Sequence, residues 1–159
     1  MVIYCVTGNH IEVGHDRLDN ICLENLDLHR AELEESNLSG SSFFNSNLRG
    51  AFLYKANLEK CNLESANLIV ADFRESILLN ASLKASIAIS TSFLGADLRC
   101  SNFERANISG ADFTNADLRG ANMLCANMEG AKFENALYND ETIWPKGFDL
   151  EGSGAVRAE

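Results

Sequence analysis

The sequence predicts an all-β protein whose chain winds into a four-sided parallel β-helix of about six coils, each made of four pentapeptides. The first observation is a pentapeptide period that runs without insertion over residues 16–140, which makes 25 pentapeptides. The second is the chemistry of each unit: the third residue is Leu in 14 units and Phe in six, and the residue two places earlier is Ala in 14 and Ser in six. The third is a column of phenylalanines that recurs at every fourth pentapeptide, at Phe73, Phe93, Phe113 and Phe133.

A period of five excludes the regular helix and the flat strand. On an α-helix, each step of five residues rotates the third residue by about 140°, which spreads these residues around the axis. On a flat strand, successive third residues would alternate between the two faces. A chain that turns once per pentapeptide keeps every third residue inside, and four such sides complete a 20-residue coil. Coils stacked at about 4.8 Å give a rod roughly 30 Å long.

The repeated motif Ala-(Asp/Asn)-Leu-x-x resembles that of the pentapeptide-repeat family. Residues 56–60 read Ala-Asn-Leu-Glu-Lys, and residues 111–115 read Ala-Asp-Phe-Thr-Asn. The resemblance covers about four-fifths of the chain and implies a right-handed quadrilateral β-helix. Residues 142–149 also resemble the Thr-x-aromatic-Pro-x-Gly-Phe-Asp ending of cyanobacterial members, which usually continue with Pro where this chain has Leu150.

Both ends of such a rod would expose unpaired backbone and apolar side chains unless other residues cover them. Residues 1–15 are expected to form the N-terminal cap, and residues 141–149 the C-terminal cap. The main side chains of the C-terminal cap are expected to be Trp144, Pro145 and Phe148. The proline stops further strand pairing. Residues 150–159 are small and polar, so a disordered tail is expected there.

Composition and charge narrow the classes of function. The 159 residues carry 23 Asp plus Glu against 13 Lys plus Arg, a net charge of −10, and 46% are apolar, too many for a disordered chain. Direct nucleic acid binding is not expected, because phosphates require a basic surface. No apolar run approaches the roughly 18 residues of a membrane span, so no membrane interaction is expected. Residues 1–6 lack the basic flank of a signal peptide.

The cysteines point to a reducing environment. Their number is five, which is odd, and no Cys-x-x-Cys pair occurs. Free thiols and a cytoplasmic location are therefore expected. Cys61 replaces an inward Ala and should be buried and inert, whereas Cys100 and Cys125 should lie at accessible corners.

Motifs of enzymes and cofactor sites do not appear in the sequence. There is no glycine-rich phosphate loop after a strand, no His-Glu-x-x-His and no Gly-x-Ser-x-Gly. A filled interior also leaves no room for a small-molecule substrate. Cys5, His10 and His15 are residue types that bind zinc, but side chains on successive corners diverge. No metal, cofactor or catalytic residue is therefore expected.

One pentapeptide departs from the pattern. Residues 86–90 read Ser-Ile-Ala-Ile-Ser, which places Ala88 at the third position between two isoleucines. Either the register bulges at this unit, or Ile87 and Ile89 point outward and form an exposed apolar patch. Exposed apolar patches often mark partner sites.

The 20-residue coil extends this candidate partner patch to a neighbouring unit. The patch is expected to consist of Ile69, Val70, Ile87 and Ile89. A second candidate patch, on the opposite side of the rod, is expected to consist of Ile77 and Leu79.

The leading hypothesis is a non-enzymatic scaffold that binds an unidentified protein partner through a lateral face, with self-association as one form of such contact. The alternative follows from the family resemblance, because quinolone-resistance members bind DNA gyrase as mimics of duplex DNA. This chain would then be an inhibitor of a type II topoisomerase, and the eight acidic residues against two basic ones in residues 12–35 suit that role. Basic side chains interrupt the negative surface elsewhere, namely Arg49, Arg74, Lys84, Arg99, Arg105 and Arg119.

Overall fold

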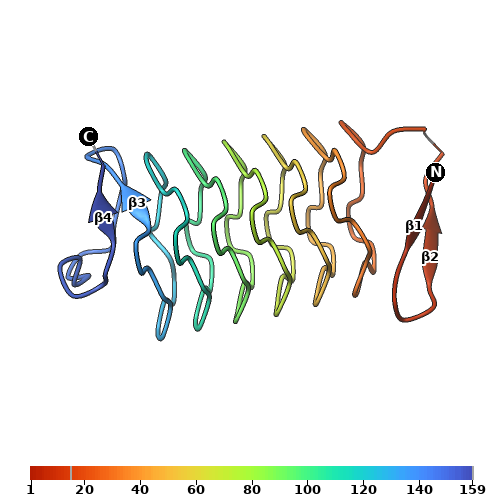
Figure 1. The fold of residues 1–159 in the computed structure, drawn as a ribbon. Coiled ribbons are helices and arrows are strands. Elements are labelled where there is room, and N and C mark those ends of the chain that lie inside the picture. Colours follow the sequence, from red (N-terminus) through yellow and green to blue (C-terminus); the bar gives the residue numbers. More distant parts are fainter. Residues whose placement is uncertain (15, 159) are drawn as a thin grey trace.

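The computed structural model describes residues 1–14 and 16–158 and shows a rod of stacked coils (Figure 1). The named strands lie at its two ends and are β1 (Val2–Tyr4), β2 (His10–Glu12), β3 (Leu137–Tyr138) and β4 (Val156–Arg157). β1 pairs antiparallel with β2, and β3 pairs parallel with β4. Between them, isolated parallel bridges join residues 20 positions apart, from Cys22↔Ser42 to Asp117↔Leu137. Nowhere in the described residues does the chain form a helix that could cross a membrane.

Each pentapeptide forms one side of a coil and one turn. The Leu28 amide donates to the carbonyl oxygen of Asn47 in the next coil at 2.8 Å, and the Asn47 amide donates back to Leu26 at 2.9 Å. The turn closes where the Ala31 amide donates to the Leu28 carbonyl at 3.0 Å. Because these bonds run between coils, the backbone groups of each side are satisfied by the coils above and below it.

The residue at each corner of the coil adopts a left-handed backbone. From residue 20 to residue 135, every fifth residue has a φ between 52° and 71°, except Cys125. A type II turn requires a positive φ at its third position, and Gly and Asn adopt it most easily. Six of these corners are Gly and six are Asn, and Val70 is the only β-branched residue among them.

The third residues of the pentapeptides fill the interior. A column of stacked rings comprises Phe73, Phe93, Phe113 and Phe133. Successive centroids lie 5.3, 5.0 and 5.1 Å apart. Some of the small inward residues satisfy their own polar groups, as where the Thr91 hydroxyl donates to the Leu68 carbonyl at 2.7 Å, whereas the buried hydroxyls of Ser86 and Ser101 have no hydrogen-bond partner among the described residues. The interior is therefore packed, and the sides of the rod provide most of the surface open to other molecules.

The β1–β2 hairpin lies across the N-terminal end of the rod (Figure 1). Ile3 is buried against the core, and the Glu32 amide of the first coil donates to the Tyr4 carbonyl at 2.8 Å. The segment expected to cover this end thus contacts the first coil through both side chain and backbone. One member of that segment, His15, lies outside the described residues.

Aromatic side chains lie over the C-terminal end. Trp144 and Phe148 stack with centroids 4.7 Å apart, and both meet the Phe133 ring edge-on, at 5.4 and 5.5 Å. Ile143 bridges Asn122, one position later than the regular interval between coils, so the chain has gained a residue after the last regular pentapeptide. The added residue brings Trp144 over the end of the phenylalanine column.

The expectation that residues 150–159 form a disordered tail is wrong for all but the last residue, which lies outside the described part of the chain. The chain turns after Leu150 and returns as β4, which adds to β3 as a parallel strand. The Val156 amide donates to the Ala136 carbonyl at 2.8 Å. The segment is ordered because its backbone pairs with the last coil, and this pairing does not depend on apolar side chains.

Candidate functional site

On one side of the rod, residues 46–50, 66–70, 86–90, 106–110 and 126–130 form what we call the isoleucine face. The same side continues at its N-terminal end into residues 26–30, where Asp27 bridges Asn47. Two columns of side chains point outward from the isoleucine face, and each coil contributes one member to each column. The first column contains Asn47, Asn67, Ile87, Asn107 and Asn127. The second column contains Arg49, Ile69, Ile89, Ser109 and Glu129.

The coil that contains Ile87 keeps the regular register. The Ile87 amide donates to the Ala66 carbonyl at 2.9 Å, and the Ala88 amide donates to the Asn107 carbonyl at 2.8 Å. Ala88 is fully buried at the third position, and 42% of Ile87 is exposed. The structure therefore contains no bulge at this unit, and the outward-pointing alternative describes it.

The four residues of the first predicted patch lie together. Ile87 and Val70 are exposed, the latter to 52%, and Ile69 and Ile89 are half-buried. The Val70 amide donates to the Ile89 carbonyl at 3.0 Å, which places the two units in adjacent coils. These side chains form one apolar area that spans two coils of the isoleucine face.

The fold itself favours Asn at the position of Ile87. The side-chain oxygen of Asn67 accepts a hydrogen bond from the Ile69 amide at 3.2 Å, and that of Asn107 accepts one from the Ser109 amide at 3.1 Å. Asn suits this position because its short side chain reaches its own backbone two residues later. Ile87 cannot accept such a bond. The position of Ile87 therefore lacks the side-chain hydrogen bond that Asn67 and Asn107 provide in the neighbouring coils.

The backbone at Val70 is a second unfavourable choice on this face. Its φ is 52°, whereas the equivalent corner is Gly50 one coil earlier, Ser90 one coil later and Gly110 two coils later. An L-residue in the left-handed region costs about 1–2 kcal/mol, and β-branching makes the conformation rarer still. Because half of the Val70 side chain is exposed, little burial offsets this strain. Strained residues of this kind occur disproportionately at functional sites.

The isoleucine face carries no charge over three consecutive coils. Residues 66–70, 86–90 and 106–110 contain no Asp, Glu, Lys or Arg. Arg49 and Glu129 stand at the two ends of the second column, and both are exposed. Neither forms an ion pair with any other described residue. An uncharged centre is thus flanked by one unpaired positive and one unpaired negative group.

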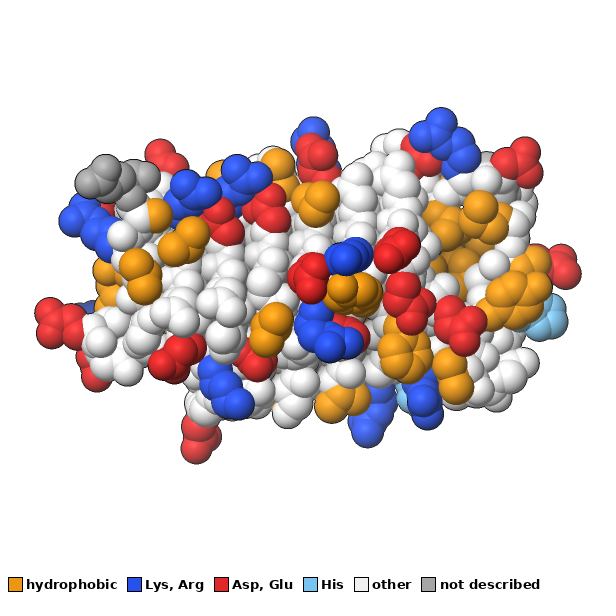
Figure 2. Space-filling view, viewed as in Figure 1, with side chains coloured by type: hydrophobic (Ala, Val, Ile, Leu, Met, Phe, Trp, Pro, Cys, Tyr) orange, Lys and Arg blue, Asp and Glu red, His pale blue; other side chains and the backbone are white. Residues whose placement is uncertain are grey.

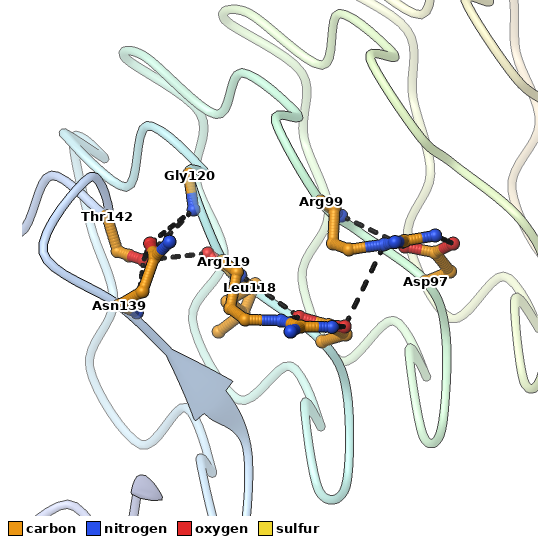
Figure 3. Close-up of polar contacts among 8 residues, drawn as sticks. Asp97, Arg99, Leu118, Arg119, Gly120, Asn139 and Thr142 are labelled. Atoms are coloured by element: carbon orange, nitrogen blue, oxygen red, sulfur yellow. Dashed lines mark hydrogen bonds and ion pairs between the residues drawn. The ribbon is translucent and has the colours of Figure 1, made fainter. Parts of the chain in front are cut away.

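The opposite side of the rod carries paired charges instead (Figure 3). Arg99 and Arg119 each form an ion pair at 2.6 Å with the aspartate two residues before them, Asp97 and Asp117. Arg99 also lies 3.8 Å from Asp117 in the next coil. Each arginine thus lies against at least one aspartate, and the four groups neutralise one another, so this side has less charge left for a partner.

The second predicted patch lies on that opposite side and is narrower. Ile77 is 43% exposed and Leu79 is half-buried. Ile77 bridges Asn57 and Asp97 in the adjacent coils, so polar residues flank it in both directions. In the middle of the face drawn in Figure 2, apolar side chains likewise stand among acidic and basic ones. The uncharged surroundings of Ile87 set the isoleucine face apart.

A family model described as pentapeptide repeats matches the chain in eight copies, over residues 21–59, 66–105, 76–115 and 96–135. The matched residues make up more than half of the chain. The chain belongs to the pentapeptide repeat family. The family predicted from the sequence is thereby confirmed. Known structures of pentapeptide repeat proteins are right-handed quadrilateral β-helices, in agreement with the predicted class of fold.

Several solved pentapeptide repeat proteins are similar to this one. A trypsin-treated form of QnrB1, a plasmid-mediated fluoroquinolone resistance protein, has a TM-score of 0.62 and 18% identity, over 92% of this chain and 86% of that chain. The protein alr5209 from Nostoc PCC 7120 has 29% identity and a TM-score of 0.45, over 64% of this chain and 84% of that chain. Rfr23 from the cyanobacterium Cyanothece 51142 has 21% identity and a TM-score of 0.43, over 81% and 88% of the two chains. No curated protein matched the sequence.

The described part of this pentapeptide repeat protein contains no cluster of three or more His, Cys, Asp or Glu side chains that could hold a metal ion. Cys5 is buried at the N-terminal end, and His10 is exposed on β2. His15, the third residue considered as a ligand, lies outside the described residues. Cys5 and His10 therefore lie in different surroundings, one buried and the other on the surface.

Burial decides the chemistry of the thiols. Cys22 and Cys100 are exposed, whereas Cys61 is buried, and loss of solvation raises the pKa of its thiol to about 12. Cys125 departs from the regular corner, since its amide donates to the Met123 carbonyl at 2.6 Å and its side chain packs on the core. Loss of solvation raises its pKa to about 12 as well, so this thiol is less accessible than expected.

Arg49 and Glu129 were not among the predicted site residues, although they delimit the isoleucine face. Their relation is visible in the sequence once the residue after each third position is followed in steps of 20. That column runs Arg, Ile, Ile, Ser, Glu from residue 49 to residue 129. The apolar residues alone do not reveal this relation, because it depends on the uncharged residues in the middle of the column and on the charged residues at its two ends.

Proposed function

We propose that the protein is a non-enzymatic pentapeptide-repeat scaffold that binds a protein partner through the isoleucine face. Ile87 carries this proposal, because it exposes an apolar side chain at a position where the fold favours Asn. The proposal takes the rod as about six coils of four pentapeptides each, with a cap at each end. Its interior is filled, so its sides are the surfaces that remain for binding.

The chemistry of the isoleucine face suits a protein surface. Its centre is apolar, and the amide side chains of Asn67 and Asn107 lie on either side of Ile87. A desolvated apolar centre with a polar rim is the usual anatomy of a protein interface. The backbone hydrogen bonds of the face run between coils, so the face is rigid before it binds, which lowers the entropic cost of association.

The test compares proteins captured from lysate of the native host by the wild type and by the double variant Ile87→Asn/Val70→Asn. Both changes follow rules of the repeat, because Asn occupies the rest of the Ile87 column and six of the corners. Thermal unfolding should therefore show a fold at least as stable as the wild type.

A captured protein that is lost with the double variant and retained with Ile77→Asn, the matched change on the opposite side, supports the proposal. Equal capture by the wild type and the double variant excludes the isoleucine face as the binding surface. A steep loss of stability in the double variant would show that these side chains act in folding.

A second candidate function is DNA mimicry, in which the acidic rod binds and inhibits DNA gyrase. The net charge of −10 and the likeness in fold to QnrB1 support it. Ion pairs of Asp72, Asp97 and Asp117 with arginines reduce the free negative surface and weigh against it. A supercoiling assay separates the two functions, because mimicry requires inhibition at protein amounts comparable to gyrase, and the scaffold requires none.

A further inference from the structure

We infer that the partner bound by the isoleucine face is a second copy of this chain, in an antiparallel dimer. The inference rests on the proposed function, since it uses the same face, and it adds the identity and the orientation of the partner. The two-fold axis lies between the two faces, at right angles to the rods, at the level of the coil that contains Ile87. Under this symmetry each column faces the same column of the partner, read in the opposite direction.

The first column is a palindrome about Ile87. It runs Asn, Asn, Ile, Asn, Asn from residue 47 to residue 127, with one residue per coil. The two-fold axis places Ile87 against Ile87 of the second copy and Asn67 against Asn107. Amide side chains both donate and accept hydrogen bonds, so Asn opposite Asn is self-complementary. An apolar pair is thus flanked by amide pairs on both sides.

The second column is antisymmetric in charge about Ile89. Arg49 lies two coils before Ile89 and Glu129 lies two coils after it, about 10 Å away in each direction at the usual coil spacing. The same axis therefore places Arg49 of each copy opposite Glu129 of the other and forms two ion pairs. Both charges lack an ion partner within the described chain, so both are available for this contact.

Charge also decides the orientation. In a parallel dimer, Arg49 would lie level with Arg49 of the second copy, and Glu129 level with Glu129. Like charges brought together at an interface oppose association, whereas complementary ones fix the register. The uncharged coils between the two groups leave nothing else that would favour a parallel arrangement.

The size of the contact sets the strength that we expect. Five coils at about 4.8 Å span only about 20 Å along the rod. Stable interfaces usually bury about 800 Å² on each partner, and a contact of this length falls below that. The dimer is therefore reversible, and it forms at micromolar or higher concentrations of protein.

The first experiment is sedimentation equilibrium of the full chain up to about 1 mM. The wild type should dimerise, and Ile87→Asn should raise the dimer Kd at least about tenfold, because it replaces the apolar pair on the axis. Ile77→Asn on the opposite side should leave the Kd unchanged. Thermal unfolding of both variants confirms that the fold is kept.

The second experiment exchanges the charges. Arg49→Glu alone and Glu129→Arg alone each convert two attractions into two repulsions and should raise the Kd at least about tenfold at low salt. The double variant Arg49→Glu/Glu129→Arg should return the Kd to near that of the wild type. A mixture of the two single variants should also associate, because both charge pairs are then complementary again.

Restoration by the double variant, together with the loss in Ile87→Asn, supports the antiparallel dimer. A monomeric wild type at all concentrations overturns it, as does a dimer that ignores Ile87 or is not restored by charge exchange. A monomeric wild type that still captures a host protein through Ile87 overturns the dimer alone and leaves the proposed function intact. If neither form of binding depends on Ile87, both proposals fail.

Discussion

At the scale of single residues, the corners of the coil show which side chains the fold selects and which it only tolerates. The left-handed φ at every fifth residue is imposed by the turn, so Gly and Asn are the residues that fit. Val70 violates this preference while half of its side chain remains exposed. A residue whose backbone conformation is strained and whose side chain is exposed is a better sign of a functional site than an exposed apolar residue alone.

Replacing Val70 with Asn should raise the free energy of unfolding by about 0.5–1 kcal/mol, because Asn tolerates the left-handed backbone. Urea unfolding at several protein concentrations measures this change. The reverse substitution at an equivalent corner, Asn80→Val, should lower the free energy by a similar amount. A less stable Val70→Asn protein would mean that packing of the Val70 side chain outweighs its backbone strain.

The thiols form the second residue-scale test. Cys22 and Cys100 are exposed and should react with a thiol reagent within seconds to minutes at pH 8. Cys61 and Cys125, with pKa values of about 12, should react only when the protein unfolds. A disulfide reagent that releases a coloured thiolate measures this by absorbance. It should show two rapidly reacting cysteines in the native protein and all five in denaturant. Rapid reaction of Cys125 would contradict its packing on the core.

At the scale of one side of the rod, paired charges add stability that depends on pH. Hydrogen bonds from Arg99 lower the pKa of the Asp97 carboxyl in the folded protein. Unfolded Asp titrates near 3.9, so the contribution of this pair is complete above that pH and is lost as pH falls through the lower folded pKa. The stability of the wild type should therefore decline as the pH falls below about 4.

The variant Asp97→Asn isolates this effect, because its side-chain oxygen can still accept a hydrogen bond from the Arg99 amide. It should be less stable than the wild type at pH 7, and the difference should shrink as pH falls below about 4. Unfolding in urea at a series of pH values measures it. A difference that stays constant down to pH 2 would show that the ion pair does not contribute.

How much could be predicted from the sequence also becomes clear at this scale. The pentapeptide period and the phenylalanine column predict the coils, because inward side chains repeat wherever the geometry repeats. The order of residues 150–158 was missed, because it depends on backbone bonds such as that from Val156 to Ala136, which leave no mark on composition. The partial burial of Cys125 was missed for a related reason, since one irregular turn breaks the corner rule there.

At the scale of the whole molecule, the two ends are treated differently from the sides. An antiparallel hairpin lies across one end, and a returning strand pairs with the last coil at the other (Figure 1). Both arrangements cover backbone edges that could otherwise pair with another rod. The proposed contact between copies would thereby be directed to the sides, which is where the isoleucine face lies.

Deletion of residues 150–159 should uncover the edge of the last coil at β3. We expect a lower unfolding temperature and association that does not depend on Ile87, because open strand edges pair readily. Sedimentation velocity of the truncated protein carrying Ile87→Asn measures this separately from dimerisation through the face. A truncated protein as monomeric and as stable as the full chain would show that β4 is dispensable.

The bridges between residues 20 positions apart have a mechanical consequence. Each coil is held only by its neighbours, so tension applied to the two termini acts on one inter-coil junction at a time. Peeling off one coil frees four pentapeptides, a contour length of about 66–72 Å. Stretching a single molecule should therefore lengthen the chain in equal increments. Each increment corresponds to the unfolding of one coil of the β-helix.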